Sequence, residues 1–199
     1  MRKSVNKKHR QDSDDTLSSV ITSNLLSLLK IFLVCFGLVY MMVNYLVRPI
    51  HVNGQSMFPT IQEGEFAFSN AFAAKFQKIE RGDVVIAYED QYLKRMVIKR
   101  VIGLPGDTVY CREDQVYIND EPLNESYLDN FWRDTIIETE DCFTQDFDPV
   151  TLGEGEYWLL GDNRINSKDS RLFGTFDRSQ IKGKGVYVVF PFSTMREID

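Results

Sequence analysis

The nine residues Val52-Asn53-Gly54-Gln55-Ser56-Met57-Phe58-Pro59-Thr60 decide how the rest of the chain is interpreted. Gly54 lets the backbone approach closely two positions before Ser56, and Pro59 restricts the chain just after it. A serine in this setting lies on a stiff, exposed turn, which is how a nucleophile is presented. Taken alone, however, the stretch is more often an ordinary turn whose hydroxyl bonds to its own backbone.

A long apolar run precedes this stretch. Residues 31–47 read IFLVCFGLVYMMVNYLV, and residues 25–29 extend the run to about the 20 residues that a bilayer core requires. The run ends in Arg48-Pro49-Ile50-His51, without the small residues of a signal-peptide cleavage site. We therefore expect an uncleaved transmembrane anchor at 25–47, with a buried core helix as the alternative.

The distribution of basic residues predicts the orientation of the anchor. Five of them lie within the first ten positions, whereas Arg48 and Lys75 are the only ones in the thirty positions after the anchor. Basic residues favour the cytoplasmic side. We expect a cytoplasmic tail at 1–24, a single pass through the cell membrane, and an extracytoplasmic domain at 48–199.

Composition excludes two classes of function. The net charge of −6, with no basic cluster beyond the N-terminus, argues against nucleic acid as a partner. The histidines are His9 and His51, and the cysteines Cys35, Cys111 and Cys142 lie far apart, so no metal-ligand spacing can be drawn. We expect neither a metal nor another cofactor.

Short strands dominate the remainder of the chain. Alternating or continuous apolar runs bounded by turns predict strands at 65–68, 84–88, 96–103, 108–111, 115–118, 156–160 and 186–190. Residues 70–77 predict a short helix with Phe72 and Phe76 in the core. The domain should be mainly antiparallel β, with a smaller insert at about 108–155 whose acidic middle, 119–149, shows no clear periodicity.

A serine nucleophile needs a base, but His9 would lie on the other side of the membrane, and His51 lies at the membrane boundary with no evident carboxylate to orient it. A lysine can serve if its pKa falls by about three units, which costs about 4 kcal/mol and requires burial. Lys99 meets this demand best, because Val97, Ile98, Val101 and Ile102 flank it in an apolar strand. The more common role of a single lysine in a strand is to protect a sheet edge.

Four segments together resemble the type I signal peptidases, which are membrane-anchored serine proteases that remove signal peptides from exported preproteins. They are Gly-Gln-Ser-Met-Phe-Pro-Thr at 54–60, Arg-Gly-Asp-Val-Val at 81–85, Lys-Arg-Val-Ile-Gly-Leu-Pro-Gly-Asp at 99–107, and Gly-Asp-Asn-Arg-x-x-Ser-x-Asp-Ser-Arg at 161–171. Their order and spacing agree with the family over most of the chain beyond the anchor.

The resemblance implies a Ser/Lys dyad, with Ser56 as nucleophile and Lys99 as general base and then general acid. Ser167 would hydrogen-bond the lysine and orient it. The polar residues that would hold this segment against the dyad are Asp162, Asp169 and Arg171, although each also fits an ordinary turn. The Ser56 N–H would serve the oxyanion hole, while Gly54 occupies the position where part of the family adds a serine donor.

The resemblance also implies a signal-peptidase/LexA-like antiparallel β domain. Its partners would be secretory preproteins and the lipid bilayer, with the substrate bound as a strand beside Val52 and the segment Met96, Val97 and Ile98. Shallow pockets would select small residues at the first and third positions before the cut. Met57, Ile61 and Val97 are candidate pocket walls, for which core packing is the default role.

Three further points stay open. A membrane-anchored assembly or chaperone protein could keep this fold with weak or no activity, and a self-cleaving repressor-type Ser/Lys protease would share the chemistry. The anchor and the acidic balance disfavour the repressor. Cys111 and Cys142 could form a disulfide in an oxidising compartment or remain free thiols.

Overall fold

The computed structural model describes residue 22, residues 24–140 and residues 142–198. The chain divides into two compact units, Met1–Asn44 and Tyr45–Asp199, and each is described by itself. Nearly all of the expected cytoplasmic tail, at 1–21 and 23, lies outside the described residues.

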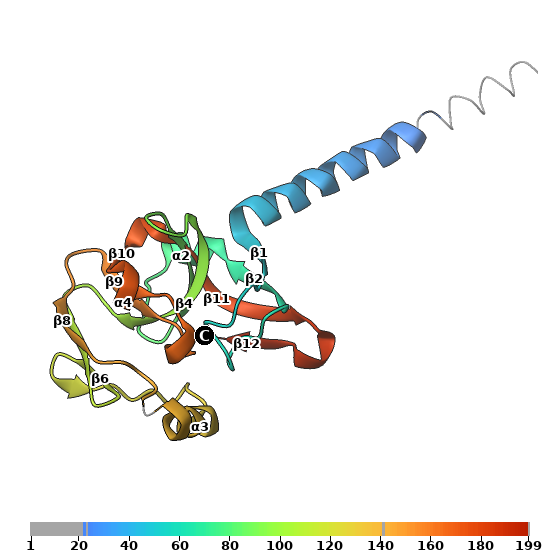
Figure 1. Cartoon of the computed structure of the whole chain (residues 1–199). Coiled ribbons are helices and arrows are strands. Elements are labelled where there is room, and N and C mark those ends of the chain that lie inside the picture. The colour runs from blue at the N-terminus through green and yellow to red at the C-terminus, as the bar shows by residue number, and fades with distance from the viewer. Residues whose placement is uncertain (1–21, 23, 141, 199) are drawn as a thin grey trace, which may run out of the picture. The chain divides into compact units, whose positions relative to one another are not determined.

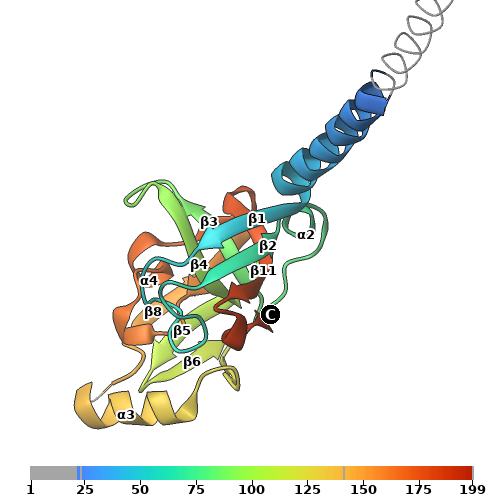
Figure 2. The same cartoon turned by 90° about the vertical axis from the view of Figure 1, so that its right-hand side faces the viewer.

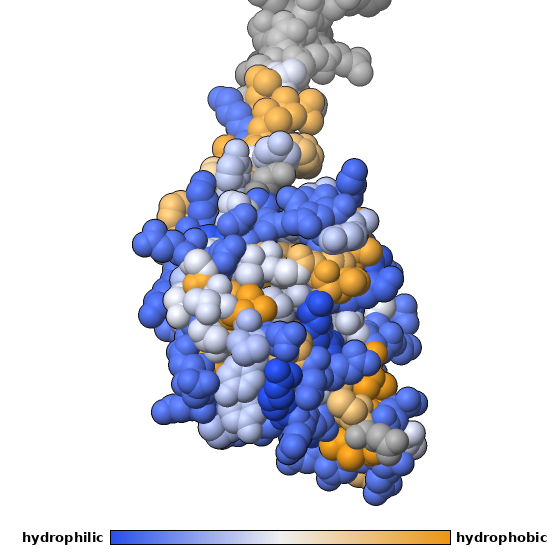
Figure 3. Space-filling view, turned by 60° about the vertical axis from the view of Figure 1, so that its left-hand side comes forward, coloured by the Kyte–Doolittle hydropathy of each residue, from blue (hydrophilic) through white to orange (hydrophobic). Residues whose placement is uncertain are grey.

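The first unit is a helix, Asn24–Met41, and a π-helical turn, Met42–Leu46, follows it. Within the described residues, this is the one helix that is long and apolar enough to cross a membrane. Its leucine, phenylalanine and valine side chains are exposed along its length, which gives the helix its largely orange surface in Figure 3.

The second unit is built on an eight-stranded antiparallel sheet (Figures 1 and 2). The strand order is β1-β2-β11-β3-β4-β9-β10, and β12 pairs with β11. The strands are β1 Val47–His51, β2 Phe66–Asn70, β3 Val84–Glu89, β4 Arg95–Gly103, β9 Glu156–Leu160, β10 Phe176–Asp177, β11 Ile181–Phe190 and β12 Arg196–Ile198. The mainly antiparallel β domain predicted from the sequence is confirmed.

Residues between Thr108 and Thr151 form a second, four-stranded sheet of order β7-β6-β5-β8. Its strands are β5 Thr108–Arg112, β6 Gln115–Ile118, β7 Glu121–Pro122 and β8 Phe147–Thr151, and helix α3, Asn130–Glu140, lies between β7 and β8 in the chain. These residues lie within the insert at 108–155. In Figure 1, α3 lies below β6 at the end of the domain.

The helices that connect the strands of the large sheet are short. They comprise α2 Ala71–Phe76, α4 Ser170–Phe173 and the 3₁₀ turns Arg164–Asn166, Arg178–Gln180 and Phe192–Thr194. Asn70 caps α2 by accepting the Ala73 N–H at 2.7 Å, as expected for an asparagine before a helix.

Three apolar clusters hold the domain together. One contains Val85, Val97 and Leu159. A second contains Met57 and Ile61, from the segment between β1 and β2, with residues of β2, β3, β11 and β12. The third joins the two sheets, because Trp158 and its neighbours in the large sheet pack against residues of β5 and β6. A small cluster around Ile136 anchors α3.

Two expectations need correction, and the structure has one of the two alternatives left open for the cysteines. Phe72 and Phe76 are 51% and 65% exposed, because α2 turns its small residues, Ala73 and Ala74, to the core. The last strand begins at Ile181 instead of 186, and the segment after it contains β12. Cys111 and Cys142 are both free thiols.

Candidate active site

Ser56 and Lys99 meet at the centre of the site. Ser56 lies in the turn between β1 and β2, and Lys99 lies in β4. Lys99 Nζ donates to Ser56 Oγ at 2.7 Å and to the Ile98 carbonyl at 3.0 Å. When the amine is neutral, the same contact lets the serine hydroxyl donate to nitrogen, which is the geometry that proton abstraction requires.

The surroundings of Lys99 weaken its basicity. The residue is 2% exposed, and this burial lowers the pKa of Lys99 from 10.5 to about 8. The charges of Asp169 and Asp162 oppose this change and raise the pKa of Lys99, whereas the charges of Arg95 and Arg171 lower it further. Near neutral pH the site therefore holds an amine that can exchange its proton.

The turn that carries Ser56 is held from both sides. Gly54 has φ +104°, a backbone conformation that favours glycine, and its N–H donates to Glu63 Oε1 at 3.1 Å. The Ser56 carbonyl accepts the Asn163 N–H at 3.0 Å, and the Gln55 carbonyl accepts Asn163 Nδ2 at 3.0 Å. Among the described residues, no group accepts the Ser56 N–H, which leaves it available to a substrate oxygen.

Asp162 joins the turn that carries Ser56 to strand β4, which carries Lys99. Its buried carboxylate accepts two hydrogen bonds from Arg100, at 2.9 and 2.8 Å, and one from Thr60 Oγ1 at 2.7 Å. Arg100 follows Lys99 in β4, and Thr60 lies four positions after Ser56. A bidentate, desolvated pair of this kind fixes geometry strongly.

Asp169 and Arg171 hold the following segment. Burial raises the pKa of the Asp169 carboxyl, but the hydrogen bonds and charge of Arg171, with the Gly161 N–H and Ser167, outweigh burial and lower it overall. Arg171 Nε and Nη2 each donate to Asp169 at 2.9 Å. Gly161 allows a close approach here, because an added Cβ would lie 2.3 Å from both Ser167 Oγ and the Ser56 carbonyl oxygen.

Ser167 lies at the site but does not bond to the lysine in this structure. Its Oγ is buried and forms no hydrogen bond of ordinary geometry, although it helps to lower the pKa of Asp169. The role expected for Ser167 thus stays a prediction.

The six candidate pocket residues do not lie together. Val52, Met57 and Ile61 are buried in one apolar cluster, and Ile98 packs against it. Val97 belongs to a different cluster, and Met96 is 45% exposed.

Several residues at the site were not singled out from the sequence. Arg164 is fully buried and pairs with Glu125 of the insert, while Trp132 of α3 lies edge-on to Phe58, with ring centroids 4.9 Å apart. Arg164 stands in the polar segment 161–171, which is the one signal that could have marked it. Among the described residues, no three His, Cys, Asp or Glu side chains gather as a metal site would need.

Comparisons with known proteins bear on this geometry. The family described as "Signal peptidase, peptidase S26" matches residues 25–190. "Signal peptidase I S" of Bacillus subtilis (strain 168) is 37% identical over 169 residues, which cover 84% of this chain and 90% of that protein. "Signal peptidase I P" of Bacillus subtilis subsp. natto is 35% identical over 175 residues, which cover 87% and 94%. A crystal structure of a signal peptidase I from Enterococcus faecalis V583 is 37% identical, covers 54% of this chain and 96% of that chain, and has a TM-score of 0.49.

Proposed function

Because the chain belongs to the signal peptidase family, peptidase S26, and is therefore a serine endopeptidase that removes signal peptides, we propose that it cleaves exported preproteins with Ser56 and Lys99 as its reacting pair. The observation that carries this proposal is the 2.7 Å contact between Ser56 Oγ and Lys99 Nζ, made by a lysine that is 2% exposed.

The reaction runs in two halves. Ser56 Oγ attacks the carbonyl carbon of the scissile peptide while neutral Lys99 takes the hydroxyl proton, and the Ser56 N–H stabilises the oxyanion. Lys99 then gives this proton to the leaving amine, which releases the new N-terminus. Water attacks the acyl-enzyme while Lys99 takes its proton, the ester bond to Ser56 Oγ breaks, and Lys99 returns the proton to Ser56 Oγ as the signal peptide leaves with a free carboxyl end.

Burial and nearby charges stabilise different protonation states of Lys99. Burial favours the neutral amine before attack, whereas the carboxylates of Asp169 and Asp162 favour the ammonium that forms during attack. Because Asp162 and Asp169 are themselves fixed by Arg100 and Arg171, they stabilise the developing charge without rearranging.

The open edge of β4 suits an extended substrate. β4 pairs with β3 over Arg95–Arg100 but with β9 only over Arg100–Gly103. Within the described part of the chain, the segment 95–99 therefore has no strand partner on its second side. A peptide can add there as a strand. We propose that small residues are required before the cut, and that the apolar side chains of Met57, Ile61 and Ile98, which pack together, form the wall that excludes larger ones.

The helix Asn24–Met41 is proposed to anchor the enzyme in the cell membrane as a single pass, with the lipid bilayer as its partner. The basic residues that precede it favour a cytoplasmic N-terminus and an extracytoplasmic catalytic domain.

The test uses the full chain in detergent with a purified preprotein, and sequencing of the new N-terminus identifies the cut. Ser56→Ala and Lys99→Ala should each abolish cleavage and keep the circular dichroism of the wild type, because both remove a reacting group. His51→Gln, which alters an exposed side chain, should cleave normally. Cleavage by purified Ser56→Ala would exclude the pair, and an inactive wild type would favour an assembly protein of the same fold.

A further inference from the structure

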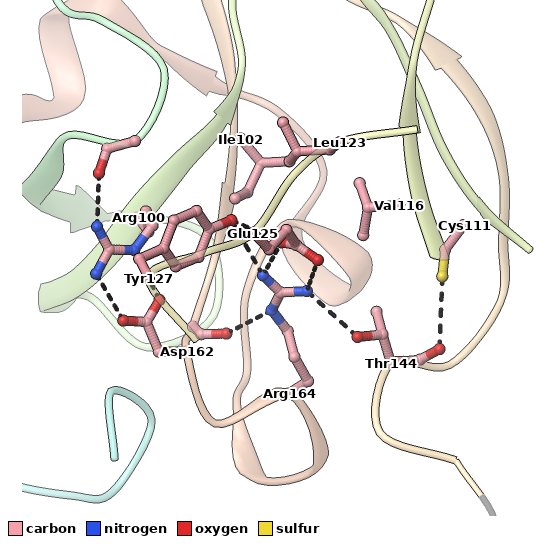
Figure 4. Close-up of polar contacts among 12 residues, drawn as sticks. Arg100, Ile102, Cys111, Val116, Leu123, Glu125, Tyr127, Thr144, Asp162 and Arg164 are labelled. Carbon is pink, nitrogen blue, oxygen red and sulfur yellow. Dashed lines mark hydrogen bonds and ion pairs between the residues drawn. The ribbon is translucent and has the colours of Figure 1, made fainter. Parts of the chain in front are cut away.

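The side chain of Arg164 connects the polar segment 161–171 to the insert. It begins the 3₁₀ turn Arg164–Asn166, and its fully buried guanidinium pairs with the carboxylate of Glu125 (Figure 4). Nη1 also donates to Thr144 Oγ1 at 3.2 Å, and Nε donates to the Gly161 carbonyl at 2.9 Å. Every contact of this side chain therefore fixes the position of the turn from 161 to 164.

The residue before Arg164 holds the nucleophile. Asn163 donates its backbone N–H to the Ser56 carbonyl and its side-chain amide to the Gln55 carbonyl, each at 3.0 Å. Because adjacent residues share a peptide unit, the position of Arg164 determines where Asn163 presents these donors. A continuous chain of contacts thus runs from Glu125 to the backbone of Ser56.

Tyr127 extends the same arrangement to the lysine strand. Its hydroxyl donates to Glu125 Oε1 at 2.6 Å, and its ring lies 4.2 Å from the guanidinium carbon of Arg100. Figure 4 shows Tyr127 between the two arginines. Arg100 is the residue after Lys99 and is bound by Asp162. One short segment of the insert therefore contacts β4, which carries Lys99, and reaches the turn of Ser56 through Arg164 and Asn163.

We propose that Glu125 is a positioning residue for Ser56, acting through Arg164 and Asn163, and that Tyr127 supports it. The proposal rests on the proposed Ser/Lys function and adds a role for the insert in it. A buried arginine that loses its carboxylate partner keeps an uncompensated charge, so the turn must shift to give that charge other partners or water. Such a shift moves Ser56 relative to Lys99.

The experiment compares Glu125→Gln with a matched control in the same insert. Asp148→Asn also removes one negative charge, but Asp148 is 94% exposed at its side chain and pairs with Arg112 at the surface. Both variants are measured as full chains in detergent for kcat, KM, the pH profile and the unfolding temperature. Rates are taken well below unfolding and expressed per folded molecule.

Glu125→Gln should lower kcat on the order of 10²-fold, which is typical when a reacting group is misplaced by about 1 Å. KM should stay within about twofold. The pH midpoint should stay close to that of the wild type, because burial, the largest influence on the pKa of Lys99, is unchanged. Asp148→Asn should match the wild type. A purely structural role would lower the unfolding temperature and leave kcat per folded molecule intact.

A double variant tests the route through Arg164. If Glu125 acts through Arg164, then Glu125→Gln combined with Arg164→Met should lose no more kcat than Arg164→Met alone. Multiplicative losses, an unchanged kcat in folded Glu125→Gln, or an equal loss in Asp148→Asn would overturn the proposal.

If Glu125→Gln does not fold, the variant Tyr127→Phe tests the positioning role of this segment of the insert instead. It removes one hydroxyl and leaves the ring on Arg100, and we expect a kcat several-fold below the wild type at unchanged KM. A wild-type kcat in this variant would then reject the proposal. An inactive Ser56→Ala beside a fully active Glu125→Gln would reject the positioning role alone, whereas an active Ser56→Ala would reject the proposed function itself.

Discussion

The cleavage rate should rise steeply between pH 6 and pH 9, because only neutral Lys99 can accept the Ser56 proton. With a pKa of about 8, roughly 1% of the lysine is neutral at pH 6, about 10% at pH 7, half at pH 8 and about 90% at pH 9. The value of kcat/KM should therefore increase close to tenfold per pH unit below pH 7 and level off above pH 9. A lysine at 10.5 would be about 0.3% neutral at pH 8, which makes burial worth more than a hundredfold in rate there.

The assay follows hydrolysis of a short peptide that contains a signal-peptide cleavage site and no ionisable side chain. The full chain is kept in neutral detergent at constant ionic strength from pH 5 to pH 10, and kcat/KM reports the free enzyme. His51→Gln is the matched control, because an ordinary histidine titrates near pH 6.5. Its profile should superimpose on that of the wild type.

Three results would refute the reasoning. A flat profile would exclude a lysine base. A midpoint near 6.5 that disappears in His51→Gln would assign the base to the histidine, and a midpoint near 10 would show that the burial of Lys99 does not change its basicity.

Three further outcomes are expected. Since the folded-state pKa of Lys99 lies below 10.5, the unfolded chain binds this proton more tightly, so wild-type stability should rise between about pH 8 and pH 10.5 and carry a penalty of up to about 3 kcal/mol at pH 7. Lys99→Met should then resist urea better than the wild type at pH 7, and lower resistance would contradict this account. Gly54→Ala should lower the free energy of unfolding by about 1–2 kcal/mol, because Gly54 has a φ of +104°, and it should also reduce kcat/KM. Gly54→Ser should show the same losses. A serine variant faster than the wild type would be evidence against backbone strain at this position. In unreduced native protein iodoacetamide should modify Cys142 and reach buried Cys111 only after unfolding, and failure of both to react in denaturant would indicate a disulfide.

The strands that position the site could be predicted from the sequence. β3, β4 and β9 are short apolar runs rich in valine and isoleucine or in aromatic residues and bounded by turn residues, and this combination favours a strand over a buried helix. The pairing of Ser56 with Lys99 came from the resemblance to the type I signal peptidases, because the residues alone favoured an ordinary turn at Ser56 and a sheet-edge lysine at Lys99. Both inferences depend on local pattern, which a single sequence contains.

Helix α3 was not predicted because it buries little. Of its residues, Ile136 alone is buried, and acidic side chains interrupt the apolar ones. Asp129, which accepts the Trp132 N–H at 2.7 Å, is the capping signal that could have indicated its start.

The contacts between the insert and the site could not be predicted from the sequence. Glu125 and Arg164 lie 39 positions apart, and a lone acidic residue in a polar loop is normally solvated. Only the tertiary fold removes water from both. The same argument applies to Thr60 and Asp162, which are 102 positions apart.

The distance along the chain between the nucleophile turn and the residue that holds it affects how the enzyme is made. Asn163 binds the carbonyl of Gln55 across 108 positions. At about 5–20 residues per second, the ribosome needs roughly 5 to 20 seconds to cover that distance. Throughout this time the growing chain already contains Ser56, and soon afterwards Lys99, but lacks the groups that orient the turn. Long-range contacts of this kind form late in folding. We therefore expect a half-synthesised chain to carry an inert serine, and cleavage to begin only once Asn163 has reached the turn that carries Ser56.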